Sequence, residues 1–520
     1  MNQADPPSPS LAARIGLFVG PLAALVLWAG PNLSDWLPGV FPQRWSAALT
    51  LDPDQPALNA MAAVAALMAI WWLTEAIPMA ATALVPLALY PLLGVMSGKE
   101  VAPHYGNHLV FLFLGGFLVA LAIEESGLHR RIALHIVAAM GDNPRLIVAG
   151  FMLATAALSM WISNTATTLM MLPIGASILV QADRAQTDAK HRQRFGVALM
   201  LGIAYAASIG GVGTLIGTPP NLAFKAIYEA AMPDEPKIEF FRWMVLAVPF
   251  SASFLVVAWL LLVRVIYPLP AQPLLGGGNV VRDELQKLGR LSKAEVRMAV
   301  IFFITALLWV TREPMQGYGW GPLLLGADSK LVNDGTSAVL MAIVCFMVPS
   351  GSASGEALLT WKATTRLPWG ILLLFGGGLA LAAGMHETEL DGYLGERLAA
   401  GIAPLPNVGK AALIACGMTW LTELTSNLAS IEMLTPVLAE ASLDLKTPPL
   451  VLMIPATLSA SCAFMLPVAT PPNAIVYGSG RVRMRDMIRA GVVLNFVGIV
   501  LVVATVWLLG RLAFGDAAAL

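Results

Sequence analysis

The chain has 520 residues, of which 57% are hydrophobic and 12% are charged. Soluble domains carry about 25% charged residues, so this composition excludes a string of soluble domains and leaves little room for a soluble enzyme on a membrane anchor. The 31 Lys and Arg residues nearly balance the 32 Asp and Glu residues, and no concentrated basic face is present. This argues against a nucleic-acid partner. We therefore predict an all-α polytopic membrane protein surrounded by the lipid bilayer.

Apolar segments recur along the chain, separated by short polar stretches. A transmembrane helix needs about 20 mainly apolar residues. We predict eleven spans, at 15–34, 57–77, 79–97, 108–127, 196–232 (broken), 241–267, 298–313, 333–349, 368–386, 449–480 (broken) and 489–511. The first span lacks a small-x-small cleavage sequence after it, so we interpret it as a retained helix and not a signal peptide.

Two further apolar segments, 146–182 and 410–440, are interrupted halfway by polar Ser-Asn sequences. We predict that each is a re-entrant helical hairpin; a pair of short spanning helices is the alternative. Basic residues flank the first segment and acidic residues flank the second. The positive-inside rule then places the ends of the first hairpin in the cytoplasm and opens the second to the outside. With eleven spans across the cytoplasmic membrane, we expect the N-terminus in the cytoplasm and the C-terminus on the outer side.

The two halves of the sequence share three motifs in the same order. A Gly-Gly pair begins at Gly115 and Gly376 (376 − 115 = 261), a Ser-Asn pair at Ser163 and Ser426 (426 − 163 = 263), and the prolines of Thr-Pro-Pro-Asn at Pro219 and Pro471 (471 − 219 = 252). By the loop charges the two copies have opposite orientations. This is the inverted-repeat signature of secondary transporters.

Each copy contains two sequences that interrupt a helix within the membrane. They are Ser163-Asn164-Thr165 and 217–221 in the first copy, and Ser426-Asn427 and 469–473 in the second. Backbone groups freed from helical bonding need other partners in a bilayer, so broken helices are tolerated where they line a cavity. We predict that the four breaks meet near the membrane midplane. Their carbonyl and hydroxyl oxygens suit a hard cation, and the helix N-termini suit an anionic carboxylate.

Two other classes of protein are rivals to a carrier. An anion channel would need a continuous polar pore, and an intramembrane enzyme would need a nucleophile, an acid-base pair or a metal cluster. The sequence offers neither clearly, since no H-E-x-x-H or G-x-S-x-G motif occurs.

At these motifs the chain resembles the divalent anion/sodium symporter family, whose members carry di- and tricarboxylates and sulfate. The sequences 71–78 and 111–117 also resemble the family, so the likeness spans nearly the whole chain. It implies a secondary active transporter, not an enzyme, that couples sodium entry to uptake of a small divalent anion, a C4-dicarboxylate or related carboxylate. It also implies a homodimer with a scaffold domain and a transport domain that moves like an elevator.

On this basis we divide the chain into five parts. Residues 1–107 are N-terminal spans, mainly scaffold; 108–232 are the first half of the transport domain; 233–367 are scaffold spans and connecting loops; 368–488 are the second half of the transport domain; and 489–520 contain the last span.

The resemblance also assigns ligands to the breaks. Two or more sodium ions are expected and no organic cofactor. One sodium ion would bind at Ser159, Ser163, Asn164 and Gly217, and another at Thr422, Thr425, Asn427 and Ala469. The anion would lie between Asn164, Thr165 and Thr218 on one side and Asn427, Leu428, Thr470 and Pro471 on the other.

Leu428 departs from the family pattern, which has a threonine at this place. The change removes a hydroxyl that would contact a substrate carboxylate. A lost hydrogen bond to a charged group costs about 1.5 to 3 kcal/mol, or about ten- to a hundredfold in affinity. A substrate with a smaller or less polar second end would fit Leu428. A sodium-independent dicarboxylate exchanger and a sulfate transporter of the same fold are the alternative functions.

Three glutamates lie in or next to apolar segments. Glu432 occupies the place that Leu169 has in the first copy, and intramembrane carboxylates are functional candidates. It could be a proton site, but our preferred interpretation is that it faces a water-filled opening. Glu75 and Glu423, each in a Leu-Thr-Glu sequence, are expected to cap helices or tie them together.

Overall fold

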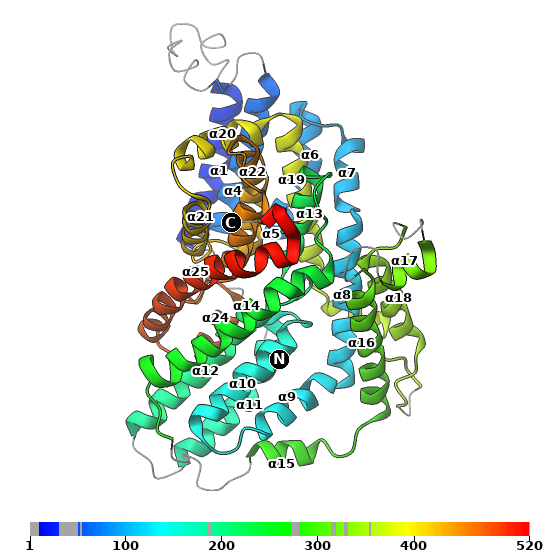
Figure 1. Ribbon diagram of the computed structural model, residues 1–520, viewed down its shortest axis with the longest axis vertical. Helices are drawn as coiled ribbons and strands as arrows, with labels where there is room; N and C mark the ends of the chain where they lie inside the picture. Colours follow the sequence, from blue (N-terminus) through cyan, green and yellow to red (C-terminus); the bar gives the residue numbers. More distant parts are fainter. Residues whose placement is uncertain are drawn as a thin grey trace.

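Figure 1 shows the protein as a computed structural model. The structure describes residues 10–30, 50–51, 55–184, 189–271, 280–313, 319–326, 331–352 and 355–518. These residues form helices joined by short loops, and their extended pairing is limited to an isolated bridge between Pro349 and Ala357. The all-α prediction is confirmed.

The helices of the first half carry the first copy of the repeated motifs. They are α1 (Leu11–Ala29), α4 (Pro56–Thr74), α5 (Met79–Thr82), α6 (Val85–Leu93), α7 (Gly98–Tyr105), α8 (His108–Ser126), α9 (Leu128–Ala138), α10 (Pro144–Ser159), α11 (Asn164–Arg184), α12 (Ala189–Gly211), α13 (Pro219–Ala231) and α14 (Phe240–Leu260), which continues as the π-helix η2 (Leu261–Ile266).

The helices of the second half carry the second copy. They are α15 (Val280–Lys287), α16 (Lys293–Thr311), α17 (Trp320–Leu325), α18 (Asp334–Met347), the 3-10 helix η4 (Trp361–Arg366), α19 (Trp369–Glu387), α20 (Leu390–Ile402), α21 (Asn407–Leu421), α22 (Asn427–Asp444), α23 (Leu450–Ala460), α24 (Pro471–Gly478), α25 (Met484–Phe514) and the 3-10 helix η5 (Gly515–Ala518).

The predicted breaks occur where the motifs place them. Helix α10 ends at Ser159, and α11 begins at Asn164 after a short loop. In the second copy, α22 begins at Asn427 after the corresponding loop. The breaks after α12 and α23 end at Pro219 and Pro471, each at the first position of a helix, where proline lacks an N–H that would be unpaired in any case.

The spans differ in number and length from the prediction of eleven. Among the described residues, nine helical stretches are long and apolar enough to cross a membrane, and the pair α20 and α21, bent by 117°, could add a tenth. The predicted span at 79–97 is interrupted, because α5 and α6 are separated by a turn at Ala83 and Leu84. The end of the predicted span at 15–34 lies outside the described residues.

Polar residues fix where several helices begin and how they pack. Asn107 and Asn143 accept backbone N–H groups at the starts of α8 and α10, which satisfies donors that have no partner within the helix. Buried ion pairs then join helices: Arg131 of α9 lies 2.7 Å from Glu295 of α16. This ion pair fixes α9 against α16.

The helices around the two Ser-Asn breaks lie in different halves of the molecule. In Figure 1, α10, α11 and α12 lie together in the lower half and α20, α21 and α22 lie in the upper half, with α25 crossing between them. Helix α10 packs against α12, and α21 packs in the same way against α23. The first contact needs a glycine, because a Cβ on Gly210 would lie 2.4 Å from the Ala156 backbone.

Candidate ion and substrate site

The first pair of breaks brings three oxygen atoms together. Ser159 Oγ at the end of α10 lies 2.5 Å from Asn164 Oδ1 and 2.7 Å from the carbonyl oxygen of Ala207 in α12. A hydroxyl has one proton, so it can donate to only one of these two acceptors. The cluster is therefore rich in oxygen and short of protons, which suits a hard cation.

The second pair of breaks repeats this arrangement. Thr422 Oγ1 lies 2.6 Å from Asn427 Oδ1 and 2.8 Å from the carbonyl oxygen of Ala460. Both the hydroxyl and the carboxamide are displaced by the same number of residues from the first copy (422 − 159 = 427 − 164 = 263). The duplicated motifs thus form duplicated local geometry.

Two asparagines hold the non-helical segments that follow α12 and α23. Asn221 Nδ2 donates to the carbonyl oxygens of Val212 at 3.2 Å and Thr214 at 2.8 Å. Asn473 Nδ2 donates to the carbonyl oxygens of Ala463 and Leu466, each at 3.1 Å. Each carboxamide thus donates to carbonyl oxygens of the turns that follow the interrupted helix. This explains the asparagine that ends both Thr-Pro-Pro-Asn motifs.

Glu423, in the loop between α21 and α22, ties that loop to the non-helical segment after α23. Its carboxylate accepts the backbone N–H groups of Phe464 at 2.7 Å, Met465 at 2.9 Å and Leu466 at 3.1 Å, as well as Asn495 Nδ2 at 2.8 Å. The residue is 3% exposed. The prediction that it ties elements together is confirmed. Glu75 is exposed and is itself the C-cap residue of α4, with φ of 50°.

The helices that begin at the breaks pack across the two copies. Helix α11 contacts α24, and α13 contacts α22. Tyr205 of α12 also donates to the carbonyl oxygen of Phe464 at 2.8 Å, beside the break after α23. The first and second copies are therefore joined at their interrupted segments.

The remaining predicted ligands have different surroundings. Thr218 and Thr470 are buried, whereas Asn164, Thr165 and Asn427 are partly exposed and Pro471 is exposed. Ser163 Oγ accepts the N–H of Ala166 at 3.2 Å, and Thr425 Oγ1 lies 2.5 Å from Ser430 Oγ. Gly217 and Ala469 lie in the turns that precede α13 and α24. The assignment of these residues to sodium or anion sites stays a prediction.

Leu428 and Glu432 both lie in α22 and are buried. Leu428 is 5% exposed and belongs to the main apolar core. Glu432 is 1% exposed, and neither carboxyl oxygen has a hydrogen-bond partner among the described residues. A Cβ on Gly378 of α19 would lie 2.2 Å from Glu432 Cδ, so this side chain fills the space beside the glycine. Our interpretation that Glu432 faces a water-filled opening is therefore wrong for this conformation.

Sequence reasoning missed the carbonyl oxygens of Ala207 and Ala460, which complete the two oxygen clusters. A backbone carbonyl has no residue signature, so nothing in either alanine marked it. The only available signal was their position on the helix that precedes each Thr-Pro-Pro-Asn break.

Interrupted helices in two matched pairs, each with an oxygen cluster, define the class of this molecule as a secondary membrane transporter. A comparison with known families makes the assignment specific. Residues 54–514 match the family described as "Sodium:sulfate symporter transmembrane region". The chain belongs to this family of sodium-coupled anion transporters, so the resemblance seen in the sequence is confirmed and the enzyme alternative is excluded.

Curated relatives match almost the full chain. The "Sodium-dependent dicarboxylate transporter SdcS" of Staphylococcus saprophyticus is 38% identical over 517 residues, which cover 98% of this chain and 93% of the relative. The protein of the same name from Staphylococcus aureus strain MRSA252 is 38% identical over 512 residues, with 97% and 93% covered.

A solved structure supports the fold. The crystal structure of the YdaH transporter of Alcanivorax borkumensis superimposes with a TM-score of 0.50 at 15% identity, covering 83% of this chain and 89% of that one. At this identity the likeness concerns the fold alone.

The contacts of Glu423 generate a stability prediction. We expect Glu423→Gln to lower the thermal midpoint of the purified protein. The carboxylate accepts four donors with two oxygens, whereas a glutamine side chain has only one acceptor oxygen for them. Bonds to a charged group contribute about 1.5 to 3 kcal/mol each. The matched control is Glu75→Gln, in the other Leu-Thr-Glu sequence, where the side chain is exposed. Equal midpoints for the two variants would contradict the structural role of Glu423.

Proposed function

We propose that this protein is a sodium-coupled carrier that brings a small divalent anion, a C4-dicarboxylate or related carboxylate, across the cytoplasmic membrane. The observation that carries the proposal is the duplicated cluster at Ser159 and Thr422, in which three oxygens share one hydroxyl proton. Sodium is a hard cation that prefers oxygen ligands, so each cluster is a candidate for one ion. The relatives named sodium-dependent dicarboxylate transporters support the same function.

The anion would bind beside the two cations. Helices α13 and α24 begin at Pro219 and Pro471 with a preceding threonine in extended conformation. A helix N-terminus contributes about 0.3 to 1 kcal/mol toward an anion, and up to about 2 kcal/mol when partly buried. The bound sodium ions would supply the remaining positive charge, which explains how the carrier can bind an anion without an arginine in the motifs.

Several finer features belong to the same proposal. We infer two or more sodium ions, a homodimer, and an elevator movement of the parts 108–232 and 368–488 against the other spans. The N-terminus would lie in the cytoplasm and the C-terminus outside. The cross-packing of α11 with α24 and of α13 with α22 supports the elevator movement, because it joins the two halves of the transport domain into one body.

The function is tested by uptake into proteoliposomes. We expect an inward sodium gradient to drive saturable accumulation of a C4-dicarboxylate such as succinate, and replacement of sodium by potassium to stop it. Sodium-free counterflow would instead establish the exchanger, and accumulation of sulfate but not succinate would establish the sulfate carrier that the family description names. Passive flux that does not saturate would defeat all three in favour of a channel.

The oxygen cluster at Ser159 makes a specific prediction about sodium. We expect Ser159→Ala to raise the sodium concentration needed for half-maximal succinate uptake by about ten- to a hundredfold, the equivalent of about 1.5 to 3 kcal/mol. The matched control is Ser177→Ala in α11, an exposed serine that donates to its own helix. The thermal midpoint without sodium shows whether Ser159→Ala folds like the native protein. If it does, and succinate uptake keeps its native dependence on sodium concentration, Ser159 is not a ligand.

The departure at Leu428 makes a prediction about the substrate. We expect Leu428→Thr to strengthen dicarboxylate binding by about tenfold or more, because a hydroxyl would become available to a carboxylate. Leu424→Thr is the control, since Leu424 is 67% exposed in the adjacent loop. Isothermal titration of purified protein in sodium measures both. Unchanged affinity would mean that this side chain does not contact the ligand.

A further inference from the structure

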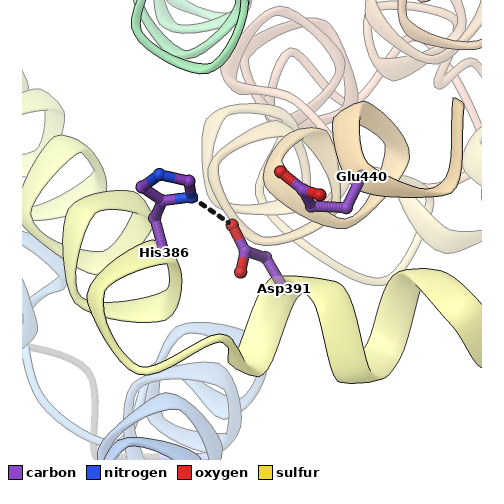
Figure 2. Close-up of side chains that lie close together, drawn as sticks. All are labelled: His386, Asp391 and Glu440. Atoms are coloured by element: carbon purple, nitrogen blue, oxygen red, sulfur yellow. Dashed lines mark hydrogen bonds and ion pairs between the residues drawn. The ribbon is translucent and has the colours of Figure 1, made fainter. Parts of the chain in front are cut away.

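Three potential metal ligands meet at one end of the second hairpin, away from the breaks. His386 comes from the last turn of α19, Asp391 from the first turn of α20, and Glu440 from α22. Figure 2 shows the imidazole and the two carboxylates turned toward a common space. One ligand atom from each residue lies within 4.8 Å of the other two, and His386 Nδ1 is 3.3 Å from Asp391 Oδ2.

The three side chains line a pocket of about 540 Å³. Its described lining includes two more acidic residues, Glu389 and Glu396, but neither Lys nor Arg. Glu389 has its own partner in the lining, because its Oε2 accepts from Gln55 Nε2 at 3.1 Å. The pocket is therefore negative, and the described side chains that converge in it are an imidazole and two carboxylates.

The burial of Asp391 is a second, independent observation. Its side chain is 7% exposed, although a carboxylate without a positive partner is costly to bury. Oδ1 accepts the N–H of Gly392 at 2.9 Å, whereas Oδ2 faces His386 Nδ1 within the cluster. Glu440 adds a second carboxylate on the same side. Two carboxylates this close repel each other unless a cation or a proton lies between them.

We propose that His386, Asp391 and Glu440 bind a divalent transition-metal cation such as Zn²⁺. Imidazole and carboxylate together favour Zn²⁺ and related ions, whereas Mg²⁺ and Ca²⁺ prefer oxygen ligands alone. Three protein ligands leave a fourth position that faces the pocket and can hold water. Because the ligands come from three helices, the ion joins α19, α20 and α22 and stabilises this arrangement of them.

The test measures zinc binding to purified, chelator-treated protein whose polyhistidine tag has been removed. We expect one Zn²⁺ per chain by elemental analysis after dialysis, with a raised thermal midpoint, and no rise with Mg²⁺. His386→Ala and Glu440→Gln should each weaken binding about tenfold or more. His386 is a safe position for substitution, because its side chain is 75% exposed.

The control and the contrary outcomes are well defined. Glu396 lines the same pocket outside the cluster, so the Glu396→Gln variant should bind zinc like the native protein. Less than stoichiometric zinc in the native protein, or equal binding in the His386→Ala/Glu440→Gln double variant, would overturn the site and leave a shared proton as the explanation. Transport in zinc-free buffer is a separate measurement, so failure here does not affect the proposed function.

Discussion

The structure depends on one constraint: a backbone group that leaves a helix inside the hydrocarbon must find another partner. Asn221 and Asn473 supply that partner for the carbonyls after α12 and α23, and Glu423 supplies it for three successive N–H groups. Because these side chains satisfy the backbone, the helices can stop and restart at the breaks. The interrupted segments are thus stable elements of the fold and not local disorder.

The same interruptions create the chemistry of the site. At each break after α10 and α21, a hydroxyl contacts both the carboxamide oxygen of the next helix and a carbonyl oxygen of a neighbouring helix. The result is an excess of oxygens over protons on each side, which a cation can balance. The two copies are not equivalent, since Glu423 corresponds to Met160 in the first copy (423 − 263 = 160). The second copy is held by charge and the first by neutral hydrogen bonds.

The sequence predicted the breaks well because prolines and Ser-Asn pairs act locally on the backbone. Helix α20 was not predicted, since Asp391 and Glu396 give it the polarity of a loop in a search for apolar spans. The burial of Glu432 against Gly378 and the meeting of His386 with Glu440 could not be predicted either. Both arise from the packing of α22 against distant helices, and no spacing in the chain encodes that packing.

Gly211 shows how a position without functional groups can fix the place of a polar side chain. A Cβ there would lie 2.4 Å from Asn164 Oδ1, so the carboxamide occupies space that only a missing methyl group provides. Alanine at this position would force the Asn164 carboxamide out of its present place. The position of a candidate ligand thus depends on a neighbour that offers no ligand atom itself.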